Sequence, residues 1–226
     1  MGYFIIAGIF SLIGMVVSNR LKSKFAQYAQ MPLSNGRSGA EVAQAMLSYY
    51  GINDVRIVQG QGMLTDHYNP ATKTVSLSPE VFHGRHVAAA AVAAHECGHA
   101  VQHNTAYAWL TFRSAMVPAV SLAARAQQYL FLLAIGAFGM GGGTFLLYLT
   151  IAAFGITTLF SLVTLPVEFD ASNRALAWLE STGFARGREH EGAKDALWWA
   201  AMTYVVAALS ALVVFLYLVL SLTNRE

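Results

Sequence analysis

Long uncharged, apolar runs alternate along this chain with shorter polar segments. No charged residue occurs in 1–19, in 126–167 or in 196–224. A transmembrane helix needs about 20 apolar residues, so the middle run is long enough for two of them. A glycine-rich sequence at 139–143 would then form the turn of a hairpin. The pattern predicts four transmembrane helices, at about 2–19, 118–140, 144–166 and 198–222.

The second predicted span is the one whose start is least defined by the pattern. It contains Pro118 and Arg125. A charge inside a membrane should face protein or water. Either Arg125 does so, or the embedded part of the span begins near Gln127.

Basic residues indicate the orientation of the chain in the membrane. Arg20, Lys22 and Lys24 follow the first apolar run directly, and 167–197 contains four more basic residues. Because basic residues favour the cytoplasmic side, we expect 20–117 and 167–197 to be cytoplasmic, with the N-terminus, the hairpin turn and the C-terminal tail outside. A cleaved signal peptide is the alternative for the first run, but its basic residues would then precede it, so a retained anchor fits better.

Composition supports a membrane protein and excludes several other classes. Of the 226 residues, 56% are hydrophobic and 12% charged, about half the charged fraction of a soluble domain. The net charge of +2 is too small to suggest nucleic-acid binding. A single cysteine, Cys97, excludes an intramolecular disulfide and any zinc site with several cysteines.

The polar segment 20–117 predicts a small α+β part. Ser38 followed by Glu41 is a capping box, so a helix should start there and end at Gly51. The sequence Ser78-Pro79-Glu80 is a second helix start. Alternating apolar residues predict a sheet of two or three short strands, and one long helix should carry the most informative motif. The strands are expected at 55–58, 63–64 and 74–78, with a loop at 66–70. The long helix should start near 85 and end beyond 103.

The motif is His95-Glu96-Cys97-Gly98-His99, an H-E-x-x-H sequence. Residues four apart on a helix lie about 40° apart around its axis and about 6 Å apart along it, so both imidazoles can reach one zinc ion. Glu96 can then polarise a zinc-bound water instead of occupying a ligand position. The alternative is a pair of core histidines. The motif favours a metallohydrolase, with Cys97 facing away from the metal.

A third ligand must come from elsewhere in the chain. His103 lies eight residues after His95, about 12 Å along an unbroken helix, which is too far for both to bind one ion through bonds of about 2.1 Å. Glu168 is the best candidate, because it follows the third predicted span on the same side of the membrane. Ala171 and Ala175 share a helical face and would permit close approach to the motif helix.

The sequence resembles a known family in four places. These are Asp66 to Pro70, Thr72 to Ser78, Ala93 to Gln102, and Leu165 to Ser172. They look like the YugP-type bacterial neutral zinc metallopeptidases, which are integral membrane proteins. More distantly, the chain is similar to the HtpX-type and CAAX-prenyl membrane proteases, whose third ligand lies in an E-F/Y-x-A-D pattern. Ser172 stands where those families have an aspartate that supports a zinc ligand.

The resemblance implies a zincin-like peptidase with one zinc ion per chain, bound by His95, His99 and Glu168. Glu96 would act as the general base. Either Ser172 or Asp170 would take over the role of the missing aspartate, and His103 would lie outside the ligand set. The strand at 74–78 would bind an extended peptide by strand addition. Candidates for stabilising the oxyanion are His67, Tyr68 and Arg174.

The expected protein is a mainly α, multi-pass zinc metalloendopeptidase of the bacterial plasma membrane, acting at the cytoplasmic surface on membrane proteins or peptides. Its partners would be the lipid bilayer and the substrate, without nucleic acid; a regulatory membrane partner is left open. The expected parts are a transmembrane helix at 1–19, a cytoplasmic metallopeptidase part at 20–117, a transmembrane hairpin at 118–166, a cytoplasmic helix with the third ligand at 167–197, and a transmembrane helix at 198–222.

Three other functions would each need features in addition to the motif. A non-catalytic scaffold with structural zinc would need a fourth ligand, such as Asp170 or His67. An intramembrane site-2 protease would need an L-D-G sequence, which is absent, and a longer apolar run before His95. A metal transporter would need polar residues within the spans, and 126–167 offers almost none.

Overall fold

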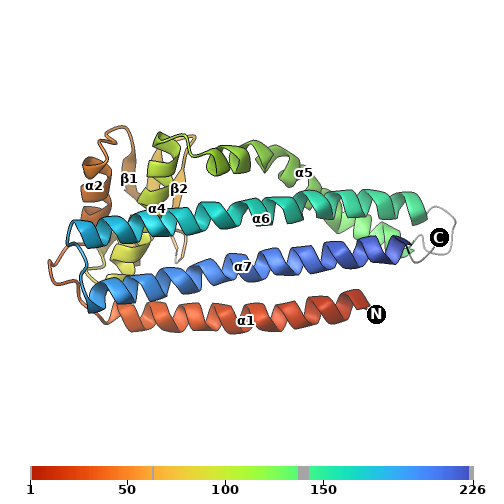
Figure 1. Ribbon diagram of the computed structural model, residues 1–226, viewed down its shortest axis with the longest axis horizontal. Helices are drawn as coiled ribbons and strands as arrows, with labels where there is room; N and C mark the ends of the chain where they lie inside the picture. The colour runs from red at the N-terminus through yellow and green to blue at the C-terminus, as the bar shows by residue number, and fades with distance from the viewer. Residues whose placement is uncertain (1, 63, 137–142, 224–226) are drawn as a thin grey trace. The chain divides into compact units, whose positions relative to one another are not determined.

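The computed structural model describes residues 2–62, 64–136 and 143–223. Within these ranges the chain is mainly helical, with one small sheet. Figure 1 follows the elements along the chain from red to blue. They are α1 (Gly2–Ala29), α2 (Gly39–Tyr49), β1 (Arg56–Gln59), β2 (His67–Asn69), β3 (Thr74–Leu77), α3 (Pro79–His83), α4 (Val87–Asn104), α5 (Ala108–Gly136), α6 (Gly143–Ser181) and α7 (Arg188–Thr223).

The chain divides into two compact units. The mixed unit comprises Val17–Leu110 and Pro166–Met202, and contains the sheet, α2, α3 and α4. The helical unit comprises Met1–Val16, Thr111–Leu165 and Thr203–Glu226. All residues of the candidate site described below belong to the mixed unit.

Among the described residues, three helices are long and apolar enough to cross a membrane, by length and composition: α1, α6 over Phe145–Ser181, and α7 over Arg188–Leu222. The expected second span, at 118–140, falls on α5, which is not among these three over its described residues. The turn expected at 139–143 lies mostly outside the described residues. The helices extend beyond the expected spans, because α6 continues past 166 to Ser181 and α7 begins at Arg188, ahead of 198.

The sheet has the order β1-β3-β2, with β1 parallel and β2 antiparallel to β3. The loop expected at 66–70 contains β2, whose His67 pairs with Ser76 of β3. Of the strand expected at 63–64, Met63 lies outside the described residues and Leu64 is not in a strand. Peptide binding by strand addition to 74–78 was also wrong, because β3 has strands paired to both of its edges.

Helix α4 is the centre of the mixed unit. Helices α2 and α3 and strands β2 and β3 all pack against it. Its first half is rich in alanine and is almost entirely buried, so these neighbours can come close. The capping box at the start of α2 is present as predicted, with Ser38 and Glu41 bonding reciprocally. At the start of α4, the His86 side chain accepts a hydrogen bond from the Ala89 amide.

Candidate metal centre

Two histidines of α4 and one glutamate of α6 meet in the mixed unit. His95 and His99 lie one turn apart, with ring centroids separated by 4.8 Å. The Nε2 atoms of His95 and His99 lie 3.4 Å and 3.6 Å from Oε2 of Glu168. Glu168 is only 3% exposed. A buried carboxylate therefore faces the same edge of both imidazoles.

These three side chains fit a zinc ion. One potential ligand atom from each lies within 4.8 Å of the others. Two atoms that each bind zinc at about 2.1 Å in tetrahedral geometry are about 3.4 Å apart, which agrees with the measured distances to Glu168. Two imidazoles and one carboxylate are also the ligand set of several catalytic zinc sites. His95, His99 and Glu168 are thus the residues that would hold the ion.

The electrostatics of the site favour positive charge. Burial alone lowers the pKa of His99, but the neighbouring Glu168 carboxylate, Glu96 and Gln102 more than offset this and raise it. A field that stabilises a protonated imidazole also stabilises a metal cation in the same position.

The Nδ1 atoms of both histidines are hydrogen-bonded. Nδ1 of His95 lies 3.0 Å from the Ser172 hydroxyl. Nδ1 of His99 lies 3.0 Å from Oε1 of Gln102. Because the amide nitrogen of Gln102 donates elsewhere, its oxygen is the acceptor, so Nδ1 of His99 carries the proton. That tautomer leaves the Nε2 lone pair free to bind a metal.

Gln102 also joins the histidine to α6. It is fully buried, and its amide nitrogen donates to the Val167 carbonyl and to the Asp170 carboxylate, both at 2.8 Å. Asp170 in turn accepts a hydrogen bond of 2.6 Å from Nε of Arg174. Ser172 and Asp170, the two candidates for the missing aspartate, thus have different contacts. Ser172 is hydrogen-bonded directly to His95, whereas Asp170 accepts a hydrogen bond from Gln102, which in turn is bonded to His99.

Small residues allow α4 and α6 to approach closely here. A Cβ atom added to Gly98 would lie 2.5 Å from the Ala171 carbonyl oxygen, closer than real contacts permit. Ala171 and Ala175 are fully buried, as expected from their shared face. The small residue between the motif histidines is therefore required to bring Glu168 within reach of them.

Glu96 and Cys97 lie next to the ligands on α4 but differ in environment. Glu96 is 8% exposed and is not part of the potential ligand group. Cys97 is fully buried, with its sulfur 3.6 Å from the Ala43 carbonyl of α2. Burial raises the pKa of the Cys97 thiol well above its usual range, so it stays protonated. The cysteine packs between helices, as expected.

The remaining candidate residues have other contacts. The Tyr68 hydroxyl is hydrogen-bonded to Nδ1 of His103 at 2.8 Å, and burial raises the pKa of this tyrosine. Nδ1 of His67 lies 2.7 Å from the Thr65 carbonyl. The Arg174 guanidinium lies over the Tyr107 ring at 5.6 Å, in addition to its bond with Asp170. Oxyanion stabilisation by His67, Tyr68 or Arg174 stays a prediction.

Sequence reasoning missed Gln102. The signal was its position three residues after His99, a spacing at which two helical side chains touch. Loss of a hydrogen bond to a zinc-binding histidine typically weakens metal binding 10- to 100-fold. We expect Gln102→Leu to lower zinc affinity by about this factor, measured by competition with a chromophoric chelator.

The control for this measurement is Gln44→Leu, at an exposed glutamine of α2 whose amide donates to Ser48 within its own helix. It should leave zinc affinity unchanged. Equal affinity in the Gln102 and Gln44 variants would show that the buried amide does not support the metal site. The thermal unfolding temperatures of both zinc-free variants should also be measured. A similar temperature in the two variants would show that weaker zinc binding comes from the orientation of His99 and not from loss of the fold.

His95, His99 and Glu168 come together from two helices, with Glu96 beside them. This arrangement is typical of the class of zinc-dependent hydrolases with an H-E-x-x-H helix. The chain belongs to the family described as "putative neutral zinc metallopeptidase", whose model matches residues 3–223. It is 40% identical over 207 residues to "Putative membrane protease YugP" of Bacillus subtilis (strain 168), covering 91% of this chain and 89% of that protein. No solved structure matches the chain. The family expected from the sequence motifs is thereby confirmed.

Proposed function

We propose that this chain is a zinc-dependent endopeptidase that cuts membrane proteins or peptides at the cytoplasmic surface of the bacterial plasma membrane. The observation that carries the proposal is the convergence of His95, His99 and Glu168, with Nε2–Oε2 distances of 3.4 and 3.6 Å. Two imidazoles and a carboxylate leave one of four tetrahedral positions for water or substrate, as catalysis requires. The family and the relative named a membrane protease support the same reading.

The chain's own residues supply the positioning and the proton transfer. Zinc bound here would polarise the peptide carbonyl and make the attacking water more acidic. Glu96 takes a proton from that water and returns it to the nitrogen of the leaving amine. Ser172 and Gln102 hold the two imidazoles in the orientation that points Nε2 toward Oε2 of Glu168, where zinc would bind.

The experiment is cleavage of a peptide mixture by the purified, zinc-loaded chain in lipid nanodiscs, read by mass spectrometry, with the Glu96→Gln variant alongside. Zinc-dependent cleavage that the variant lacks supports the proposal, and equal cleavage by both overturns it. Zinc binding without any cleavage would favour the alternative, a scaffold with a structural ion. That alternative needs a fourth ligand, yet Asp170 bonds to Gln102 and Arg174, and His67 to the Thr65 carbonyl.

We further propose four membrane spans, with the zincin-like parts at 20–117 and 167–197 on the cytoplasmic side. The support is the basic residues that follow the first span and those within 167–197. In a Cys97→Ala background, we expect Asn224→Cys to react with a membrane-impermeant maleimide on intact cells. Lys194→Cys should react only after lysis. The reverse labelling pattern would contradict either the orientation or the crossing of the membrane by α5. Labelling of both on intact cells would contradict the crossing by α7.

A further inference from the structure

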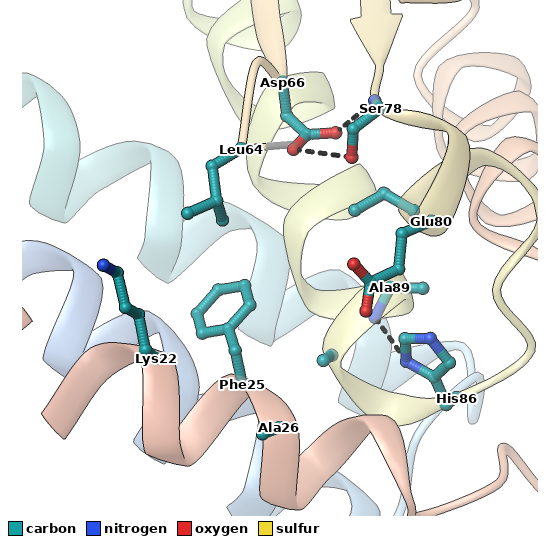
Figure 2. A pocket seen from close by; sticks show the side chains of 11 residues that line it. Lys22, Phe25, Ala26, Leu64, Asp66, Ser78, Glu80, His86 and Ala89 are labelled. Carbon is teal, nitrogen blue, oxygen red and sulfur yellow. Dashed lines mark hydrogen bonds between the residues drawn. The ribbon is translucent and has the colours of Figure 1, made fainter. Parts of the chain in front are cut away.

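A pocket of about 400 Å³ lies in the mixed unit, away from the metal ligands. Its apolar wall comes from four separate parts of the chain, α1, the loop before β2, α3 and the start of α4. Figure 2 shows the Phe25 ring rising from α1 toward the Leu64 side chain, which descends from the loop. The residues of this wall are Phe25, Ala26, Leu64, Val81, Ala88 and Ala89.

The pocket and the metal centre lie along one face of α4. Ala88 and His95 are seven residues apart, so they point in directions only about 20° apart and are separated by about 10 Å along the axis. Val92 lies between them on the same face and is half-buried. A peptide that placed one side chain in the pocket and its backbone at the metal centre would run along this face.

Two of the pocket's polar side chains are already used in the fold. The Asp66 carboxylate accepts hydrogen bonds from the Ser78 amide at 2.7 Å and from its hydroxyl at 3.1 Å. Nδ1 of His86 accepts from the Ala89 amide at 3.1 Å. Figure 2 shows these bonds as dashed lines around the apolar space. The surface left to recognise a ligand is thus mainly apolar.

Two exposed charges of opposite sign stand at the pocket, Lys22 from α1 and Glu80 from α3. Together with Asp66 they give this region more negative than positive charge. An anionic lipid headgroup would therefore be repelled more than attracted. An uncharged apolar side chain on a peptide meets no such penalty and buries apolar surface against the wall.

Leu64 is an unusual wall residue. It is 62% exposed, and its φ of 56° is a left-handed conformation that branched, bulky residues rarely adopt. This backbone conformation directs a large apolar side chain into the pocket instead of the core. An exposed apolar group held in that way gains most from a ligand that covers it.

We propose that this pocket is a substrate subsite that takes a large apolar side chain, such as leucine or phenylalanine, of the bound peptide. The inference rests on the proposed peptidase function. An extended peptide advances about 3.3 Å per residue, so a span of about 10 Å corresponds to about three residues. The recognised side chain is thus about three positions from the bond that is cut.

The test uses peptide binding, so that it does not depend on turnover. The zinc-loaded Glu96→Gln chain in nanodiscs is titrated with dye-labelled decapeptides that carry phenylalanine or glycine at one varied position, read by fluorescence polarisation. Burial of one large side chain should make the best phenylalanine peptide bind roughly tenfold more tightly than its glycine partner. Ala26→Trp, which fills the pocket from its exposed wall, should remove that difference.

The matched control is Gln27→Trp, the next residue of α1, which is exposed and does not line the pocket. It should keep the preference for phenylalanine. Loss of the preference in both variants, or in neither, would overturn the subsite. So would release of a co-purified phospholipid by Ala26→Trp, seen by native mass spectrometry, with peptide binding unchanged.

A separate measurement keeps the two proposals distinguishable. If the Glu96-intact chain cleaves a peptide mixture with a preference for apolar residues and Leu64→Ala leaves that preference unchanged, the subsite is wrong and the peptidase stands. If peptides bind through the pocket but Glu96-intact and Glu96→Gln chains cleave equally, the peptidase is wrong and the peptide site stands.

Discussion

Glu96→Gln is expected to leave zinc bound and to lower the rate of peptide cleavage by roughly 100- to 10,000-fold. Glutamine has the shape of glutamate but cannot take a proton from the attacking water. Glu96 is not among the potential ligand atoms, so the change should not remove the metal. Its 8% exposure makes an isosteric replacement preferable to alanine, which would leave a void beside His95 and His99.

The measurement is the initial rate of cleavage per zinc-loaded chain, with zinc content determined on the same samples by elemental analysis. Glu191→Gln, an exposed glutamate in the first turn of α7, is the matched control and should cleave at the unchanged rate. A Glu96→Gln rate within a few-fold of the control would show that another group supplies the base. Loss of zinc from the variant would show that Glu96 belongs to the ligand set.

A second large effect, on zinc affinity, is expected when the proposed third ligand Glu168 is changed. Glu168→Gln should lower zinc affinity by more than the 10- to 100-fold that loss of a supporting hydrogen bond costs, because a direct ligand is removed. An amide oxygen is a much poorer zinc ligand than a carboxylate, and the group is buried where no water can replace it easily. Zinc content after dialysis should fall from about one ion per chain to nearly none.

Glu180→Gln provides a control on the same helix, twelve residues further along α6 and exposed. It should retain the full zinc content. If Glu168→Gln also retains one ion per chain at the same affinity, the third ligand lies elsewhere. In that case the 3.4 and 3.6 Å contacts to His95 and His99 would be an ion pair and not a metal site.

The features that could be predicted from the sequence are those that depend on residues close together in the chain. The capping box of Ser38 and Glu41 depends on residues three apart, and α2 begins where they predict. The two histidines of α4 share a face through their spacing alone. Glu168 could be predicted to lie near these histidines because its position after the third apolar run, and its motif, are both local signals.

The features that could not be predicted depend on partners far apart in sequence. Gln102 is 65 residues from Val167 and 68 from Asp170, and no periodicity links them. The three residues of β2 lie in a turn-rich segment, and they become a strand only because β3 offers them a free edge. The end of the apolar run at 167 did not end α6, because a helix continues wherever tertiary packing supports it.

The Gln102 side chain couples the metal centre to the packing of α6 on α4. Gln102 meets His99 with its oxygen and α6 with its nitrogen, and α6 also supplies Glu168. Separation of α6 from α4 would thus remove Glu168 from the site. In the same step, Gln102 would lose its partners on α6, and the ring of His99 would no longer be held in one orientation. If zinc binds here, we expect metal capture and helix docking to be one cooperative event. A newly made chain would then complete its metal centre only after α6 has been synthesised and docked.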